Sequence, residues 1–439
     1  MKKFGLFLSD ILALYGSLLL TLYIRYGKLE DFGYYHNLHL IPFGITFVLW
    51  LIIFYIADLY EPKTFRNNLD FYSSLFPSIL IASSISIIFF YFIPFFITPK
   101  TNLFIFIVLF TGFEVINRFL WNKLFETKFK KSVLIIGSDQ HTEELIKFIK
   151  GHPQMGYEIK YIFDVGDENV RRISKLVNNG SIDTVIVAPD AYKHSKLINT
   201  FYKTLIHKIS FYNSATFYEK ITGRVLLGAI DQIWFLENLG GAKKKTYELA
   251  KRVIDIIFSI LLGVMSLVFY PFIILIIRSS TPGPIFYRQK RVGQAGEIFE
   301  IIKFRTMVQN AEKKTGAVWA SDNDPRVTRA GKFLRKSRLD ELPQLWNILK
   351  GDMAFVGPRA ERPEFQDLLQ KNVPFYEERY LIKPGLSGWA QINFRYGSSV
   401  EDASEKLKYD LYYIKNRSLT LDLGIILKTI RISLQQSGK

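Results

Sequence analysis

The apolar stretch VIDIIFSILLGVMSLVFYPFIILII, residues 253–277, decides how the chain meets the membrane, because it is long enough to cross a bilayer. Basic residues flank it on both sides: Lys243, Lys244, Lys245, Lys251 and Arg252 before it, and Arg278, Arg288, Lys290 and Arg291 after it. An excess of lysine and arginine favours the cytoplasm, so both flanks are expected on that side. Pro271 removes a backbone hydrogen bond and kinks a helix. We therefore predict a re-entrant helix that bends and returns; a straight span that tolerates the proline is the alternative.

Four further apolar segments predict an N-terminal bundle of four transmembrane helices within residues 1–125. The segments are Phe4–Ile24, Leu40–Ala57, Leu75–Phe96 and Leu103–Ile116. The last is the weakest, because it holds Glu114. No cleavage site follows the first segment, which is therefore expected to be retained. Basic residues in the second loop and after the fourth segment predict cytoplasmic termini.

Residues 132–235 predict a separate α/β domain built on a parallel sheet. Val133–Gly137 and Thr184–Ala188 are short apolar runs typical of buried strands, and helical patterns follow them. The turn after the first run lacks the further glycines that let backbone amides approach a pyrophosphate. A structural or regulatory role is therefore the preferred interpretation, and nucleotide binding is the alternative.

Composition narrows the chemistry. The 439 residues include no cysteine, and all six histidines lie between His36 and His207. Thiolate catalysis and a histidine-based triad in the C-terminal half are therefore excluded. The net charge of +17 is compatible with nucleic acid, anionic lipid or phosphorylated substrates, so only its location can decide.

Many cations surround two adjacent carboxylates, Asp340 and Glu341. These cations are Lys303, Arg305, Arg326, Arg329, Lys332, Arg335, Lys336 and Arg338. Guanidinium groups bind phosphate oxygens in pairs, which favours a phosphate ligand, although a basic face on anionic lipid explains the charge equally well. Asp340 stands at a helix start, where capping is its simplest role. It could also attack a phosphoryl group, with Glu341 holding a divalent metal.

Two loops rich in glycine and proline follow, at Val356–Arg359 and at Lys383–Gln391. Such turns allow backbone amides, Arg359 or Arg395 to approach a ligand, and ordinary loop chemistry is the alternative.

The ordered motifs over residues 246–439 resemble the bacterial sugar transferase family of polyprenyl-phosphate hexose-1-phosphate transferases, also called monotopic phosphoglycosyl transferases. The motifs are Lys251–Arg252 with Asp255, Gly283–Pro284, Lys303–Met307, Leu339–Gln344, Asn347, Lys350–Met353, Val356–Arg359, Lys383–Gly385 and Gly388–Gln391. The whole chain resembles the long-form members. That resemblance implies a multi-domain membrane protein with a four-helix transmembrane bundle, a Rossmann-like α/β middle domain, and a mainly α catalytic domain that carries the re-entrant helix.

The resemblance also implies a reaction at the cytoplasmic face of the bacterial inner membrane. Asp340 would attack the sugar-bearing phosphate of a UDP-sugar and expel UMP, and undecaprenyl phosphate would then take the phosphosugar from the aspartate. Glu341 would bind Mg²⁺. The implied phosphate partners are Lys303, Arg305, Arg338, Arg359 and Arg395, and the implied substrate loops hold Gln344, Asn347, Gly357, Pro358 and Gln391. The product would enter exopolysaccharide, capsule or O-antigen synthesis.

Other functions and partners remain to be weighed against this reaction. A glycosyltransferase that releases UDP and a non-catalytic assembly scaffold are the alternatives. No nucleic acid partner is expected, a homodimer is left open, and the sugar is not specified by any motif.

Two positions depart from the family pattern. Tyr270 precedes Pro271 where the family usually has serine, so we expect a helix break without support from a serine hydroxyl. Ala360 replaces a frequent proline after Arg359, which is expected to loosen that turn.

Overall fold

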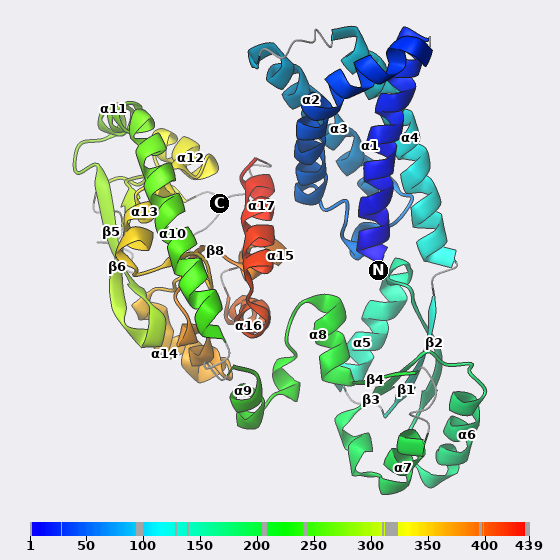
Figure 1. The fold of residues 1–439 in the computed structure, drawn as a ribbon. Coiled ribbons are helices and arrows are strands. Elements are labelled where there is room, and N and C mark those ends of the chain that lie inside the picture. The colour runs from blue at the N-terminus through cyan, green and yellow to red at the C-terminus, as the bar shows by residue number, and fades with distance from the viewer. Residues whose placement is uncertain are drawn as a thin grey trace. The chain divides into compact units, whose positions relative to one another are not determined.

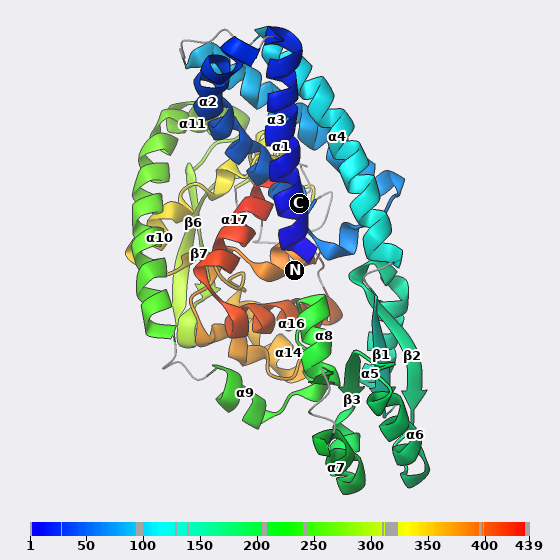
Figure 2. The ribbon, with the colours of Figure 1, turned by 45° about the vertical axis from the view of Figure 1, so that its right-hand side comes forward.

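A computed structural model of the chain describes residues 2–27, 29–93, 100–127, 130–137, 140–203, 209–239, 244–309, 311, 324–394, 397 and 399–434. Most of these residues are helical (Figures 1 and 2). The chain divides into two compact units, Met1–Ser214 and Ala215–Lys439.

The first unit opens with four long helices, all of them apolar and long enough to cross a membrane. They are α1 (Lys2–Tyr26), α2 (Leu29–Ile56), α3 (Leu69–Phe92) and α4 (Lys100–Thr127). Aromatic rings such as Trp50, Phe106 and Phe110 pack between them. Arg118 is fully buried and lies 2.5 Å from both Asp10 and Glu114. These ion pairs allow charged residues to lie inside otherwise apolar helices.

A four-stranded parallel sheet follows in the same unit, with strand order β2-β1-β3-β4. Its strands are β1 (Lys131–Ile136), β2 (Tyr157–Phe163), β3 (Thr184–Val187) and β4 (Ser210–Asn213), which alternate with helices α5 (Gln140–Gly151), α6 (Asp167–Asn178) and α7 (Ser195–Lys203). Both predicted strands are confirmed as β1 and β3, whose apolar side chains are buried. Gly137 is needed for packing, because a Cβ there would lie 2.7 Å from that of Ala188.

The second unit begins before the sequence motifs do. Its first helices are α8 (Ser214–Thr222) and α9 (Gln232–Leu239). Val225 between them and Phe235 in α9 are buried in one cluster with Phe365 and Leu411. The Val225 amide donates to the carbonyl of Lys408 over 2.9 Å. Residues 215–239 therefore pack on the C-terminal domain as part of its core.

The apolar stretch of residues 253–277 is divided between two helices that do not share one axis (Figures 1 and 2). Helix α10 (Lys245–Ser266) leads through a short 3₁₀ turn, Leu267–Phe269, into α11 (Tyr270–Ser280). At the turn, the Leu267 amide donates to the carbonyl of Val264 and not to that of Gly263, as it would in a continuous α-helix. The hydroxyl of Ser266 donates to the Gly263 carbonyl over 2.7 Å. The expectation of a break without a serine hydroxyl is therefore wrong, because Ser266 supplies one from the preceding turn.

Both helices of this segment pack against the same globular domain. Arg252 of α10 donates to the carbonyls of Ile348 and Leu349 over 2.6 and 2.7 Å. Ile273 and Ile277 of α11 are buried with Phe304 and Leu334. The two ends of the apolar segment therefore contact one domain, whereas the ends of a straight span are separated by a bilayer core of roughly 30 Å.

The globular domain itself is mainly helical. Its elements are the antiparallel strands β5 (Phe286–Val292) and β6 (Ile298–Phe304), the parallel strands β7 (Ala354–Val356) and β8 (Gly385–Ser387), the 3₁₀ turns η8 (Leu339–Glu341) and η9 (Tyr376–Leu381), and helices α12 (Arg329–Lys336), α13 (Gln344–Lys350), α14 (Pro363–Asn372), α15 (Trp389–Asn393), α16 (Val400–Asn416) and α17 (Leu419–Leu434).

Candidate active site

The two predicted catalytic carboxylates lie on η8, the turn that joins α12 to α13. Arg338 precedes it with a left-handed backbone (φ 57°, ψ 12°), which is costly for a residue with a side chain and reverses the chain sharply. Asp340 and Glu341 are consequently buried, with 6 % and 9 % of their surface exposed. The N-cap of α13 is Pro343, so Asp340 does not take the capping role that was its simplest interpretation.

Glu341 is surrounded by three predicted phosphate partners from three separate elements. Lys303 Nζ on β6 lies 2.9 Å from Glu341 Oε1, Arg359 lies 3.6 Å from the same oxygen, and Arg338 lies 3.8 Å from Oε2. Burial alone would raise the pKa of Glu341, but the charges of Lys303, Arg359 and Arg338 outweigh it and hold that pKa well below its usual value. Glu341 therefore stays ionised.

Asp340 is in the opposite electrostatic state. Burial, reinforced by the charge of Glu341 and opposed by Lys303, Arg335 and Arg338, raises the pKa of Asp340 to about 6. Its buried Oδ1 accepts no hydrogen bond from any described residue. Such a buried oxygen is normally paired, so a carboxylate oxygen that has no described partner is a candidate nucleophile.

The carboxylates could hold only part of a metal's coordination shell. Within the described ranges, no group of three histidine, cysteine or acidic side chains converges. Magnesium is commonly bound by one or two carboxylates together with substrate phosphate oxygens, and the hard oxygens of Asp340 and Glu341 fit that pattern. The residues therefore suit a magnesium ion shared with a phosphate, with Glu341 as the predicted ligand.

Asn347 and Gln344 on α13 have different surroundings. Asn347 Oδ1 accepts from the Ile302 amide over 3.1 Å, and its Nδ2 donates to the carbonyl of Glu300 over 2.7 Å. It thus fastens α13 to β6 immediately before Lys303. Gln344 is 4 % exposed, and its Nε2 has no partner among the described residues, which leaves a buried donor for a ligand.

Arg305 lies apart from this cluster in its contacts. It donates to the carbonyls of Pro282 and Thr281 over 2.5 and 2.7 Å, at the loop that follows α11. Gly283 has φ +121°, and a Cβ there would lie 2.3 Å from the Arg305 guanidinium, which explains the glycine. The structure does not bring Arg305 to Glu341, and its role in phosphate binding stays a prediction.

The two glycine-rich loops form one unit. The Gly357 amide donates to Ser387 and the Gly385 amide to Pro358, each over 2.9 Å. A Cβ on Gly385 would lie 2.0 Å from the nitrogen of Gly357, so these backbones touch where no side chain fits. This ladder fixes the strand end from which Arg359 reaches Glu341.

The remaining predicted residues are placed as follows. Gln391 Oε1 is buried without a described partner, close to Gly388. Pro271 stands at the start of α11, next to the break. Arg395 lies outside the described residues.

Sequence reasoning missed the part played by Arg252. It noted this residue only as a basic flank and family motif, whereas the guanidinium binds the last carbonyls of α13. A cation near a helix C-terminus is stabilising, but the pairing joins elements about a hundred residues apart and has no local sequence signal.

Comparisons with known proteins identify relatives of this chain. A profile of the family described as bacterial sugar transferase matches residues 246–436. The UDP-N-acetylgalactosamine-undecaprenyl-phosphate N-acetylgalactosaminephosphotransferase of Aeromonas hydrophila is 42% identical over 224 residues, which cover 50% of this chain and 51% of that protein. The chain thus spans about half the length of this relative.

Two further relatives match over a larger share of both chains. The UDP-galactose-lipid carrier transferase of Erwinia amylovora is 30% identical over 342 residues, 70% of this chain and 69% of its own. The UDP-glucose:undecaprenyl-phosphate glucose-1-phosphate transferase of Klebsiella pneumoniae is 32% identical over 326 residues, 69% of this chain and 67% of its own. The three relatives are named for three different sugars.

Proposed function

This chain belongs to the bacterial sugar transferase family, and from that premise we propose that it transfers a sugar-1-phosphate from a UDP-sugar to undecaprenyl phosphate and releases UMP. The names of the relatives support this reaction. The observation that carries it is Asp340 Oδ1, which has no hydrogen-bond partner among the described residues and lies beside a carboxylate held by three cations.

The transfer proceeds in two displacements at one phosphorus. Asp340 Oδ1 forms a bond to the sugar-bearing phosphorus of the UDP-sugar, and the bond to the bridging oxygen breaks, so that UMP leaves. A phosphate oxygen of undecaprenyl phosphate then attacks the same phosphorus and the aspartyl–phosphorus bond breaks, which restores the Asp340 carboxylate. A covalent intermediate means that the soluble donor and the lipid acceptor need not be bound at the same time.

The surrounding side chains supply charge and position. Lys303, Arg338 and Arg359 face the site and stabilise the negative charge that builds up on the phosphoryl oxygens. Glu341 is held ionised by the same cations and would bind a magnesium ion, which would offset charge on the phosphates. Gln344 offers a buried donor one helical turn after Asp340.

The packing of η8 on the re-entrant segment supports access from the membrane. Leu339 and Leu342, on either side of the carboxylates, pack with Ile273 and Ile277 of α11. An acceptor with its lipid tail in the bilayer therefore has a short path to Asp340. Together with the basic flanks, this supports a site at the cytoplasmic face of the bacterial inner membrane.

The test is nucleotide release by the purified full chain with Mg²⁺, undecaprenyl phosphate and UDP-glucose, UDP-galactose or UDP-N-acetylgalactosamine. We expect UMP with at least one donor and a loss of at least about 10³-fold in Asp340→Asn and Asp340→Ala. Asp367→Asn, an exposed carboxylate on α14, is the matched control and should keep full activity. Release of UDP, or an active Asp340→Ala variant, would reject the covalent transfer in favour of a glycosyltransferase or a scaffold.

A further inference from the structure

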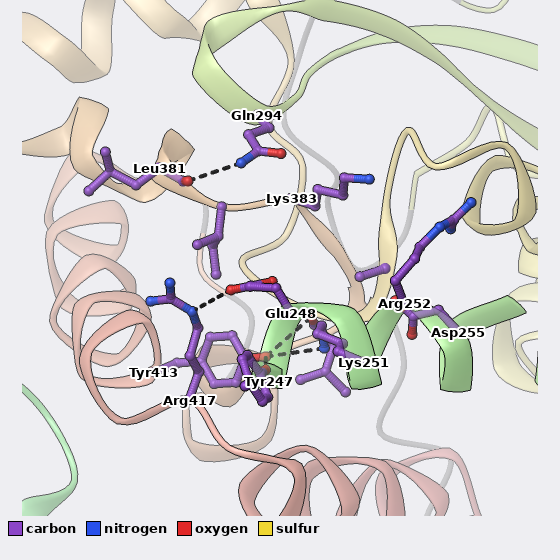
Figure 3. Close-up of a pocket in the computed structure, with 13 residues that line it drawn as sticks. Tyr247, Glu248, Lys251, Arg252, Asp255, Gln294, Leu381, Lys383, Tyr413 and Arg417 are labelled. Carbon is purple, nitrogen blue, oxygen red and sulfur yellow. Dashed lines mark hydrogen bonds and ion pairs between the residues drawn. The ribbon is translucent and has the colours of Figure 1, made fainter. Parts of the chain in front are cut away.

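A cavity in the C-terminal unit lies away from the carboxylates. It has a volume of about 410 Å³, and neither Asp340 nor Glu341 lines it (Figure 3). It reaches the other end of α13, where Arg252 holds the carbonyls of Ile348 and Leu349. Leu349 follows Glu341 by eight positions along η8 and α13, a rise of about 12 Å at about 1.5 Å per residue.

Among the described residues, four basic and two acidic side chains line this cavity. Two of the basic groups are already paired. Lys251 lies 2.7 Å from Asp422, and Arg417 lies 2.8 Å from Glu248. The charge that remains belongs to Arg252 and Lys383, with Asp255 as the other acidic group.

Lys383 and Arg252 face the same point. A Cβ built on Gly351 would lie 3.4 Å from Lys383 Nζ and 3.3 Å from Arg252 Nη2, and Figure 3 shows both side chains extending to the same side of the cavity. The Lys383 ammonium has no hydrogen-bond or ion-pair partner within the part of the chain that the structure describes. Two cations that converge without a shared anion repel each other, and a bridging oxyanion relieves that repulsion.

We propose that this cavity binds a phosphate-type oxyanion between Lys383 and Arg252. A phosphate has enough oxygens to accept from the ammonium and from the free N–H groups of the guanidinium at once. Gly351, with φ +101°, closes α13 without a side chain and leaves the space open.

The ligand can come from the membrane or from solution. Arg252 directly precedes the apolar part of α10, where Val253 and Ile257 are 48 % and 56 % exposed. If α10 lies in the bilayer, the cavity opens at the level of lipid head groups. A head-group phosphate and a soluble phosphate present the same oxygens to Lys383, so the experiment must separate them.

The site also touches both supports of the candidate active site. Arg252 grips α13, which follows the catalytic turn, and Lys383 begins the loop that pairs with Gly357 and Arg359. An anion held here would tie these two elements together at the end opposite the carboxylates.

Hydrogen–deuterium exchange on the full chain locates the anion without any need for turnover. In nanodiscs of neutral phosphatidylcholine, inorganic phosphate should slow exchange in peptides that cover residues 349–353 and 381–386. Lys383→Gln should raise the phosphate concentration that gives half of this protection about tenfold, which is the loss of affinity expected for one charge-assisted hydrogen bond. Lys383→Arg should restore it. Lys350→Gln removes a neighbouring exposed lysine that pairs with Asp352, and should behave as wild type.

A second arm replaces part of the neutral lipid by phosphatidylglycerol and omits phosphate. Protection in this arm alone would assign the site to a lipid head group, and protection by phosphate alone would assign it to a soluble anion. Protection in neither arm, or equal protection in Lys383→Gln, would overturn the proposal. These outcomes leave the proposed transferase reaction standing, because UMP release is measured separately.

Discussion

Asp340 and Glu341 are neighbours in sequence, yet their pKa values move in opposite directions. Burial acts to raise both pKa values, but cations outweigh it only at Glu341, which Lys303 and Arg359 contact, whereas Asp340 keeps a buried oxygen without a described partner. The sequence predicted this pair and its three cations from ordered motifs. It could not distinguish a capping Asp340 from a nucleophilic one, because that choice depends on where the turn η8 points the side chain.

Asp340→Asn should stabilise the folded protein above pH 6. The pKa of Asp340 is about 6 in the folded state against 3.8 as its ordinary value, so the folded state binds more protons between these values. Stability therefore falls as the pH rises through this window, and the cost is fully present above it. Removing the charge should recover on the order of 1–3 kcal/mol at pH 8 and little at pH 3.5.

The apparent Tm in nanodiscs at both pH values measures this effect. Asp367→Asn on the exposed face of α14 should leave the Tm unchanged at either pH. A lower Tm for Asp340→Asn at pH 8 would mean that the carboxylate serves the fold.

At the scale of elements, short strands and buried side-chain hydrogen bonds position the residues of the candidate active site. Strands β7 and β8 have three residues each, too short for a periodic signal, and their pairing depends on contact between glycine backbones. The predicted place of Asn347 in a substrate loop stays a prediction, and in the structure its polar atoms bind β6 and Asp352. Buried amides of this kind can be distinguished from ligand contacts only when the neighbouring strand is known.

Asn347→Ala should weaken both the fold and the reaction. It removes two hydrogen bonds to backbone groups of Glu300 and Ile302, worth about 2 kcal/mol of unfolding free energy together. Because Ile302 precedes Lys303, the rate of UMP release should fall about tenfold or more, with kcat affected more than KM. Asn372→Ala, which removes an exposed bond to Leu368 at the end of α14, is the control. Normal kcat in Asn347→Ala would show that α13 is held without this clamp.

For the whole molecule, the path of the segment Lys245–Ser280 decides on which side of the membrane the C-terminal domain lies. Hydropathy alone allowed a straight span, and charge together with Pro271 favoured a bend. The packing of α10 and α11 on one domain agrees with the bend, as does the hydroxyl of Ser266 within the break. The role of Ser266 has no local sequence signal, because this residue stands five positions before Pro271 and forms no Ser-Pro pair.

Cysteine labelling tests this topology directly, since the natural chain contains no cysteine. Lys245→Cys and Ser280→Cys place single thiols at exposed positions, at the first residue of α10 and at the last residue of α11. In intact spheroplasts, a membrane-impermeant maleimide should label neither position, and in inside-out vesicles it should label both. Labelling of one thiol in each preparation would establish a straight span.

The packing of segment 215–239 determines where a C-terminal fragment of this protein should begin. Its Val225 and Phe235 cover Phe365 and Leu411. A recombinant fragment that starts at the first sequence motif, near residue 246, would therefore expose an apolar patch that is separate from its membrane face. Such a fragment should aggregate even in good detergent. A fragment that starts at Ala215 retains the residues that cover this patch and is the better candidate for purification.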